Sequence, residues 1–145
     1  MPDFKSHPLF KKLFSLDLPP EDYAVFGSGP MYAHGLRKGI ADLNIIARGK
    51  AWQKTHEFGG EQTAHSGLGK AVLPAEGIQI YNAWGPGKWT ADELIDTSEI
   101  IDGIRFVTLD KVADWKELMG RPKDIEDVEA IKTYLENLKS ARNSG

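Results

Sequence analysis

Hydrophobic positions in residues 1–20 recur at three- and four-residue intervals, with Lys11 and Lys12 between them. This spacing is typical of an amphipathic helix whose apolar side packs on a core. Two short apolar runs follow, at 22–26 (DYAVF) and 43–47 (LNIIA), and glycine or polar residues bound each of them. Such runs predict buried β-strands.

The second half of the chain shows a different order of elements. Apolar runs at 70–73 and 78–84 flank a turn, and those at 100–101 and 104–107 flank Asp102-Gly103, so each pair predicts a β-hairpin. Two helical patterns follow. The last begins near Pro122 and is expected to turn its apolar side chains inward: Ile125, Val128, Ile131, Leu135 and Leu138.

This order of elements, together with length and composition, predicts one folded unit. Early alternation of strands and helices, then hairpins, then helices indicates an α+β fold with one mixed β-sheet flanked by helices. The 145 residues suffice for one ordinary core, and 41% hydrophobic and 27% charged residues are close to globular averages. We expect a single domain over 1–145, with 1–20 as an N-terminal helical extension and 140–145 as a frayed tail.

Charge and residue usage exclude several classes of function. The formal net charge of −3 argues against broad binding to nucleic acid or anionic membranes, but not against a local basic site for phosphates. The absence of cysteine excludes disulfides, zinc–thiolate sites and a cysteine nucleophile. No apolar run has the length of a membrane span, and the first residues do not resemble a signal peptide. We expect a cytoplasmic protein without a membrane partner.

The candidate chemistry lies between the first two strands. Gly27 and Ser28 form a turn that leads from a strand into a short helix, and such a turn offers unpaired backbone N–H groups to phosphate. Asp42 and Asn44 point to the same face of the second strand, where oxygen ligands suit Mg²⁺ bound against a triphosphate. A Gly-Ser turn alone is more often a plain connection; its place between strand and helix, with Asp42 following, favours a phosphate site.

In these residues the chain resembles the nucleotidyltransferase superfamily, in the minimal form shared with antibiotic nucleotidyltransferases and certain toxin–antitoxin proteins. Residues 26–28 (FGS) and 42–45 (DLNI) are similar to the family's Gly-Ser and Asp-x-Asp/Glu segments. A second stretch, 116–127 (KELMGRPKDIED), resembles a Lys, then Gly-Arg-x-Lys-Asp-x-x-Asp element of many members. The resemblance covers most of 23–135 and implies a nucleotidyltransferase-like fold.

The resemblance also implies a reaction. A nucleoside monophosphate would pass from a nucleoside triphosphate, with ATP as the expected one, to a hydroxyl of an unknown acceptor, with Mg²⁺ as cofactor. Gly27 and Ser28 would hold the phosphates, and Lys116 and Lys123 would neutralise their charge. Arg37 is a further candidate for phosphate binding, although a solvated loop explains this residue equally well.

For catalysis and metal binding, the resemblance assigns Asp42 and Asn44, with Asp124 as a secondary catalytic candidate. Asp124 also suits the first turn of a helix, where the helix dipole favours negative charge without any chemistry. Trp89, in a glycine-rich loop, is a candidate for stacking on a base, although a place in the core is the default for tryptophan.

The chain departs from the family pattern at two of three acidic positions, which hold Asn44 and Gln79. An amide oxygen ligates magnesium without offsetting its charge, and it cannot act as a general base. Glu61 or Glu76 would have to take over from a loop. Two functions therefore stay open: a nucleotidyltransferase with a weakened metal site, and an inactive protein of the same fold that binds a nucleotide or a protein partner. A third acid close to Asp42 in the folded chain would favour the enzyme.

Overall fold

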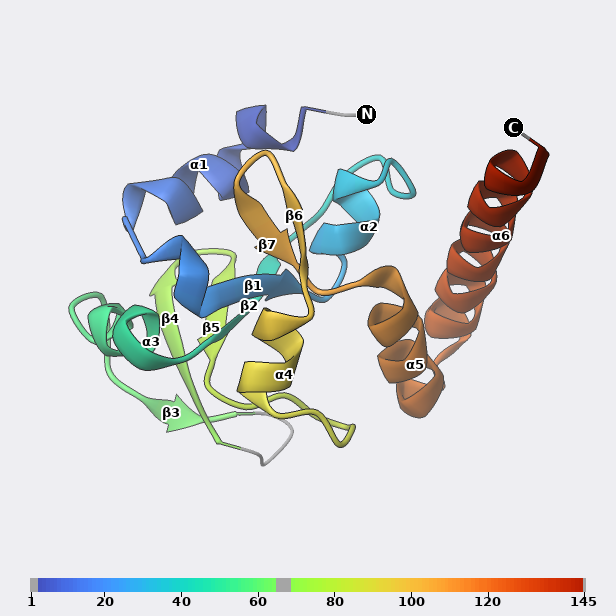
Figure 1. Cartoon of the computed structure of the whole chain (residues 1–145). Coiled ribbons are helices and arrows are strands. Elements are labelled where there is room, and N and C mark those ends of the chain that lie inside the picture. Colours follow the sequence, from blue (N-terminus) through green and yellow to red (C-terminus); the bar gives the residue numbers. More distant parts are fainter. Residues whose placement is uncertain (1–2, 65–68, 145) are drawn as a thin grey trace.

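The computed structural model describes residues 3–64 and 69–144, in which one mixed seven-stranded sheet forms the centre (Figure 1). The strands are β1 (Tyr23–Phe26), β2 (Leu43–Ala47), β3 (Gln62–Thr63), β4 (Lys70–Ala75), β5 (Ile78–Tyr81), β6 (Glu99–Ile101) and β7 (Ile104–Phe106). Their order across the sheet is β3-β4-β5-β2-β1-β7-β6. β2 runs parallel to β5 and β1 parallel to β7, while the other neighbours are antiparallel.

Helices cover the sheet and extend the chain beyond it. They are α1 (Pro8–Ser15), α2 (Gly29–Ala33), α3 (Gly49–Thr55), α4 (Ala91–Asp96), α5 (Leu109–Met119) and α6 (Pro122–Ser144), with 3-10 turns η1 (Phe4–Ser6) and η2 (Pro20–Asp22). The expected α+β architecture with one mixed sheet is confirmed. Both predicted hairpins are present, as β4–β5 and β6–β7. The predicted loop at 60–69 contains the short strand β3, and its residues 65–68 lie outside the described part of the chain.

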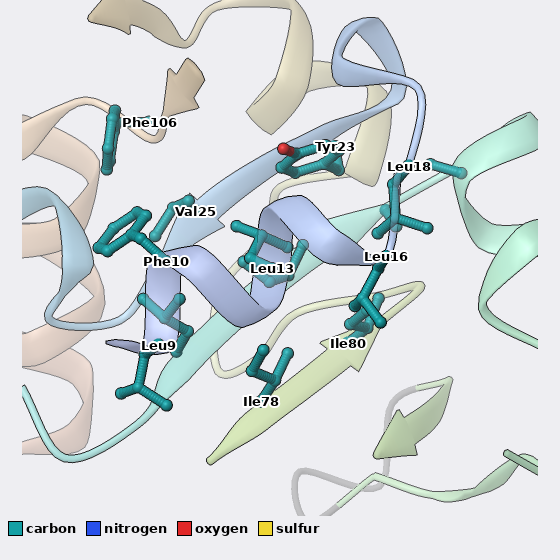
Figure 2. Packing of buried hydrophobic residues seen from close by; sticks show 14 of the residues in the cluster. Leu9, Phe10, Leu13, Leu16, Leu18, Tyr23, Val25, Ile78, Ile80 and Phe106 are labelled. Atoms are coloured by element: carbon teal, nitrogen blue, oxygen red, sulfur yellow. The ribbon is translucent and has the colours of Figure 1, made fainter. Parts of the chain in front are cut away.

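Strand alternation divides the core into two halves. Tyr23 and Val25 of β1 face one side of the sheet, where α1 lays Phe10 and its neighbours across β1 and β5 (Figure 2). Ala24 and Phe26 face the other side, toward α4, α5 and α6. Fully burying an aliphatic or aromatic side chain contributes about 1.5–3 kcal/mol, so both halves hold the sheet firmly between helices.

The second half of the core is rich in aromatic rings. Phe26 stacks on Trp84 with ring centroids 4.3 Å apart, and Trp115 of α5 meets both rings edge-on. Asn44 and Gln79 are register partners on the parallel strands β2 and β5, and each shares its strand face with the residue two positions on, Ile46 and Tyr81, which belong to or pack against this half. The polar residues at the beginning of these two strands therefore lie beside the aromatic cluster.

The inward face of α6 differs from the prediction. Val128 and Ile131 are buried as expected, but Ile125 is 56% and Leu138 37% exposed, and Asp124 is fully buried in the first turn. The ion pairs of Asp124 and Asp127 draw these two residues inward, and this turns Ile125 to solvent. The helix runs on to Ser144, through most of the tail for which fraying is expected. In the described part of the chain, no helix has the length and apolar character needed to cross a membrane.

Candidate functional site

A cavity of about 670 Å³ lies beside the aromatic cluster, and we call it the main cavity. Its walls come from the turn after β1, the start of β2, the segment after β5, the second half of α5 and the beginning of α6. The lining residues are Gly27, Ser28, Arg37, Ile40, Ala41, Asp42, Asn44, Tyr81, Ala83, Trp84, Gly85, Pro86, Trp115, Lys116, Met119, Arg121 and Lys123. Segments far apart in the sequence thus share one site.

The turn after β1 depends on glycine. Gly27 has a φ of +65°, and a Cβ there would lie 2.8 Å from Nδ2 of Asn44, which faces it from β2. The backbone conformation strains any other residue there, and a side chain would also require that of Asn44 to move. Ser28 precedes α2 and makes no side-chain capping hydrogen bond. Because α2 has only five residues, its dipole adds little, and backbone N–H groups are the main feature that this turn offers to an anion.

Asp42, Asn44 and Gln79 lie at the N-terminal ends of the two inner strands β2 and β5. Asp42 is exposed and lines the main cavity together with Asn44. Gln79 pairs with Asn44 across β2 and β5 but does not line the main cavity. Burial raises the pKa of Tyr81, and the charge of Asp42 raises this pKa further, so the phenol stays protonated at neutral pH.

Among the described residues that line the main cavity, Asp42 is the only acid. Neither loop acid considered from the sequence joins it: Glu61 lies 3.3 Å from His56, and Glu76 stands in the turn between β4 and β5. No group of three or more metal-ligating histidine, aspartate or glutamate side chains gathers anywhere in residues 3–64 and 69–144. Among the described residues, no second acid therefore joins Asp42 in the lining of the main cavity.

Four cationic side chains line the main cavity, and we call them the cationic wall: Arg37, Lys116, Arg121 and Lys123. Arg121 and Lys123 are exposed, whereas Lys116 is only 3% exposed. With Asp42 as the one lining acid among the described residues, the lining side chains carry a net charge of +3, which Asp124 and Asp127 directly behind them reduce to +1, in a chain whose net charge is −3. Such a concentration of cations in a concave site attracts anions.

Two aspartates behind the wall hold three of its four cations in place. Nζ of Lys116 lies 2.9 Å from Oδ2 of Asp127, and the same oxygen accepts a 2.6 Å hydrogen bond from Nη2 of Arg37. Oδ1 of Asp124 lies 3.7 Å from the same lysine nitrogen, and Arg121 donates to both Asp124 oxygens. Each of the two aspartates therefore pairs with two cations.

Asp124 is fully buried and does not line the main cavity. Burial alone would raise the pKa of Asp124, but hydrogen bonds from the side chain and backbone N–H of Arg121, and the charges of Arg121 and Lys116, hold this pKa below its ordinary value. The carboxylate also accepts the backbone N–H of Arg121 at 3.2 Å, as in half of a capping box. Its contacts are those of a residue that orders the start of α6 and the wall.

Several residues that line the main cavity were not predicted from the sequence. Arg121 lies inside the 116–127 stretch, and its position between Lys116 and Lys123 could have identified it as a candidate for phosphate binding. Trp84 and Trp115 line the cavity although tryptophan is by default assigned to a core, and no sequence signal separates these cases. Trp89, the candidate for base stacking, does not line the cavity and packs against the aromatic cluster.

Comparison of the chain with protein-family models, with curated proteins and with solved structures produced no match.

Proposed function

We propose that the protein binds a nucleoside triphosphate in the main cavity and transfers the nucleoside monophosphate to a hydroxyl acceptor, on a nucleotidyltransferase-like fold. The observation that carries this proposal is the cationic wall facing the Gly27–Ser28 turn and Asp42 around one cavity. A triphosphate has the charge to match such a wall, and a cavity of about 670 Å³ is within the range of small-molecule sites.

The aromatic lining supports the nucleoside part of the proposal. Trp84, Trp115 and Tyr81 line the same cavity as the cations. A purine base offers a flat π-surface that packs on such rings. The cavity thus combines a polar, positively charged wall for phosphates with an apolar wall for a base.

Magnesium fits the site only with help from the nucleotide. Asp42 supplies one carboxylate and Asn44 an amide oxygen, and Mg²⁺ in nucleotide sites is commonly held by one or two carboxylates together with substrate phosphates. When bound, the ion would polarise the phosphates and offset their charge. The chain's own cations supply the rest of that charge, with Lys116 held in position by Asp124 and Asp127.

In the proposed reaction the acceptor oxygen bonds to the α-phosphorus while the bond from this phosphorus to the bridging oxygen breaks. Pyrophosphate leaves, and the hydroxyl proton passes to water. The cationic wall stabilises the charge that accumulates on the departing pyrophosphate. Catalysis is then mainly positioning and charge neutralisation.

The test is a titration with ATP, GTP, CTP and UTP, with and without Mg²⁺, followed by product analysis. Because Trp84 and Trp115 line the cavity, tryptophan fluorescence reports binding directly. Lys116→Met should weaken ATP binding about tenfold, since a positive charge in the wall beside the phosphates is lost. Lys50→Met, at an exposed position on α3, is the matched control and should change nothing. Absence of triphosphate binding to the native protein would refute the proposal.

A second function is favoured by one observation, the amides Asn44 and Gln79 at two positions where the resemblance expects acids. It is nucleotide binding without transfer. Asp42→Ala separates the two functions. In an enzyme this change abolishes turnover, whereas in a pure binder it removes repulsion and preserves or tightens Mg²⁺-free ATP binding. No turnover in the native protein, together with tighter ATP binding in Asp42→Ala, would establish the binder.

A further inference from the structure

A second, smaller cavity adjoins the main cavity. Its volume is about 230 Å³, and Asp42, Asn44 and Tyr81 line both cavities. The other walls of the second cavity come mainly from β3, β4 and β5. Ligands in the two cavities would therefore meet at the start of β2, on either side of the same three side chains.

The two cavities differ sharply in charge. Four cations line the main cavity, whereas none of the described residues that line the second cavity is a lysine, arginine or histidine. Among these described residues the only charged group is the shared Asp42, and the other polar groups include Gln62, Thr63 and Gln79. A phosphate or carboxylate would leave water there without a cation to pair with, and this is costly. The second cavity thus suits an uncharged, hydrogen-bonding ligand.

One residue that lines this cavity carries an unpaired acceptor. Oε1 of Gln79 is buried and has no hydrogen-bond partner among the described residues, so a ligand in the cavity reaches it when the side-chain amide turns toward the cavity. Buried polar atoms are rarely left unpaired, so this oxygen calls for a donor such as a hydroxyl group. Leu73, 48% exposed on the same wall, offers an apolar contact for the carbon skeleton of the ligand.

We propose that the second cavity binds the acceptor, and that the acceptor is an uncharged polyhydroxy compound of the sugar or polyol class. This inference rests on the proposed nucleotidyl transfer. One acceptor hydroxyl, at the boundary formed by Asp42, forms the new bond to the α-phosphorus of the nucleotide in the main cavity. Pyrophosphate leaves on the side of the cationic wall, and the hydroxyl proton goes to water.

The test follows the side-chain amide signals of Gln62 and Gln79 by NMR in the ¹⁵N-labelled full chain. The probes are a panel of neutral monosaccharides and polyols and, for each, its phosphate ester. Neutral probes should shift both signals at concentrations up to about 0.1 M, which corresponds to weak but specific binding. Gln79→Leu should weaken this binding about tenfold, as measured on Gln62, because one hydrogen bond is lost. Gln53→Leu makes the same change at an exposed position on α3 and should have no effect.

Three results would overturn the proposal: no neutral probe shifts these signals, phosphate esters shift them equally, or Gln79→Leu binds the probes unchanged. An ATP titration of the same sample, followed on the indole signals of Trp84 and Trp115, tests the main cavity separately. ATP binding without any neutral-probe binding refutes the acceptor site but leaves the proposed function standing. Neutral-probe binding without ATP binding refutes the acceptor role and the proposed function together.

Discussion

At the scale of single residues, Asp127 connects two cations of the wall that come from different parts of the chain. Arg37 follows α2, and Lys116 belongs to α5, yet both reach the same carboxylate oxygen. One side chain therefore fixes the spacing between two parts of the main cavity. Since Lys116 is 3% exposed, it depends on its counter-ions more than a surface lysine does.

Removing the acid should cost more stability than removing the lysine. Asp127→Asn leaves the buried Lys116 with only Asp124 at 3.7 Å, and we expect a loss of about 2 kcal/mol in the free energy of unfolding. Lys116→Met should cost clearly less, because Asp124 and Asp127 keep Arg121 and Arg37 as partners. Urea unfolding measures both variants, with Glu126→Gln at an exposed neighbouring position as control. Equal losses for the two variants would contradict the network as described.

Asn44 offers a second prediction at this scale. In Asn44→Asp a carboxylate joins Asp42 at the start of β2, and two carboxylates hold Mg²⁺ better than one. A new charge about 4 Å from the ion gains several kcal/mol at an effective dielectric near 20, before desolvation is subtracted. We expect Mg²⁺ affinity in the presence of ATP to rise at least about tenfold. Asn137→Asp, exposed on α6, adds the same charge elsewhere. Unchanged Mg²⁺ affinity would show that residue 44 does not face the ion.

The residues named from the sequence gather well in the folded chain. Gly27, Ser28, Arg37, Asp42, Asn44, Lys116 and Lys123 all line the main cavity. These residues could be predicted from the sequence because phosphate and metal chemistry needs particular polar groups in a particular order. The aromatic walls of the cavity could not be predicted, because a lining tryptophan and a core tryptophan have the same local sequence pattern.

At the scale of elements, α6 shows where periodicity misleads. Its inward face begins with Asp124 and Asp127 and continues with Val128 and Ile131. A hydrophobic pattern scores aspartate as outward, so it assigns the first inward position to Ile125. By contrast, β2 matches its predicted range of 43–47, since a continuous apolar run in the middle of a sheet has few alternatives. β3 has only two residues, both exposed, and leaves no pattern to find.

The buried start of α6 should give the protein a characteristic acid sensitivity. The folded-state pKa of Asp124 lies below its unfolded value of about 3.9, so the unfolded chain takes up this proton first as pH falls. The stabilisation from Asp124 is complete above about pH 5 and declines below about pH 4, through the folded pKa. Asp124→Asn should be less stable at neutral pH and should lose less further stability on acidification. Unfolding free energies of both proteins between neutral pH and pH 3 measure this; parallel curves would refute it.

At the scale of the whole molecule, net charge and site charge have opposite signs. The chain carries −3, while the cationic wall exceeds the single lining acid of the main cavity. Long-range repulsion of an anion by the whole protein is weak compared with local attraction inside a concave site. Net charge alone therefore argues against broad binding to polyanions, but it does not predict whether a single cavity attracts an anion.

The affinity of the main cavity for an anion should depend on salt concentration. Arg121 and Lys123 are exposed, so ions screen them readily, whereas Lys116 is shielded. We expect ATP affinity to fall severalfold between about 0.05 and 0.5 M NaCl, as the Debye length shortens. In the double variant Arg121→Met/Lys123→Met, affinity should be lower and the salt dependence shallower. An unchanged slope in that variant would mean that these two side chains do not contribute to anion binding.

The hydrogen bond between Arg37 and Asp127 joins residues 90 positions apart. During synthesis from the N-terminus, all residues of the sheet and of α5 are made before Asp127. Until then, Arg37 has no Asp127 to pair with. Arg121 and Lys123 come equally late. The main cavity thus has its full lining and its Arg37–Asp127 contact only once α6 has docked. A ligand that needs these cations can stabilise the fold only from that point on.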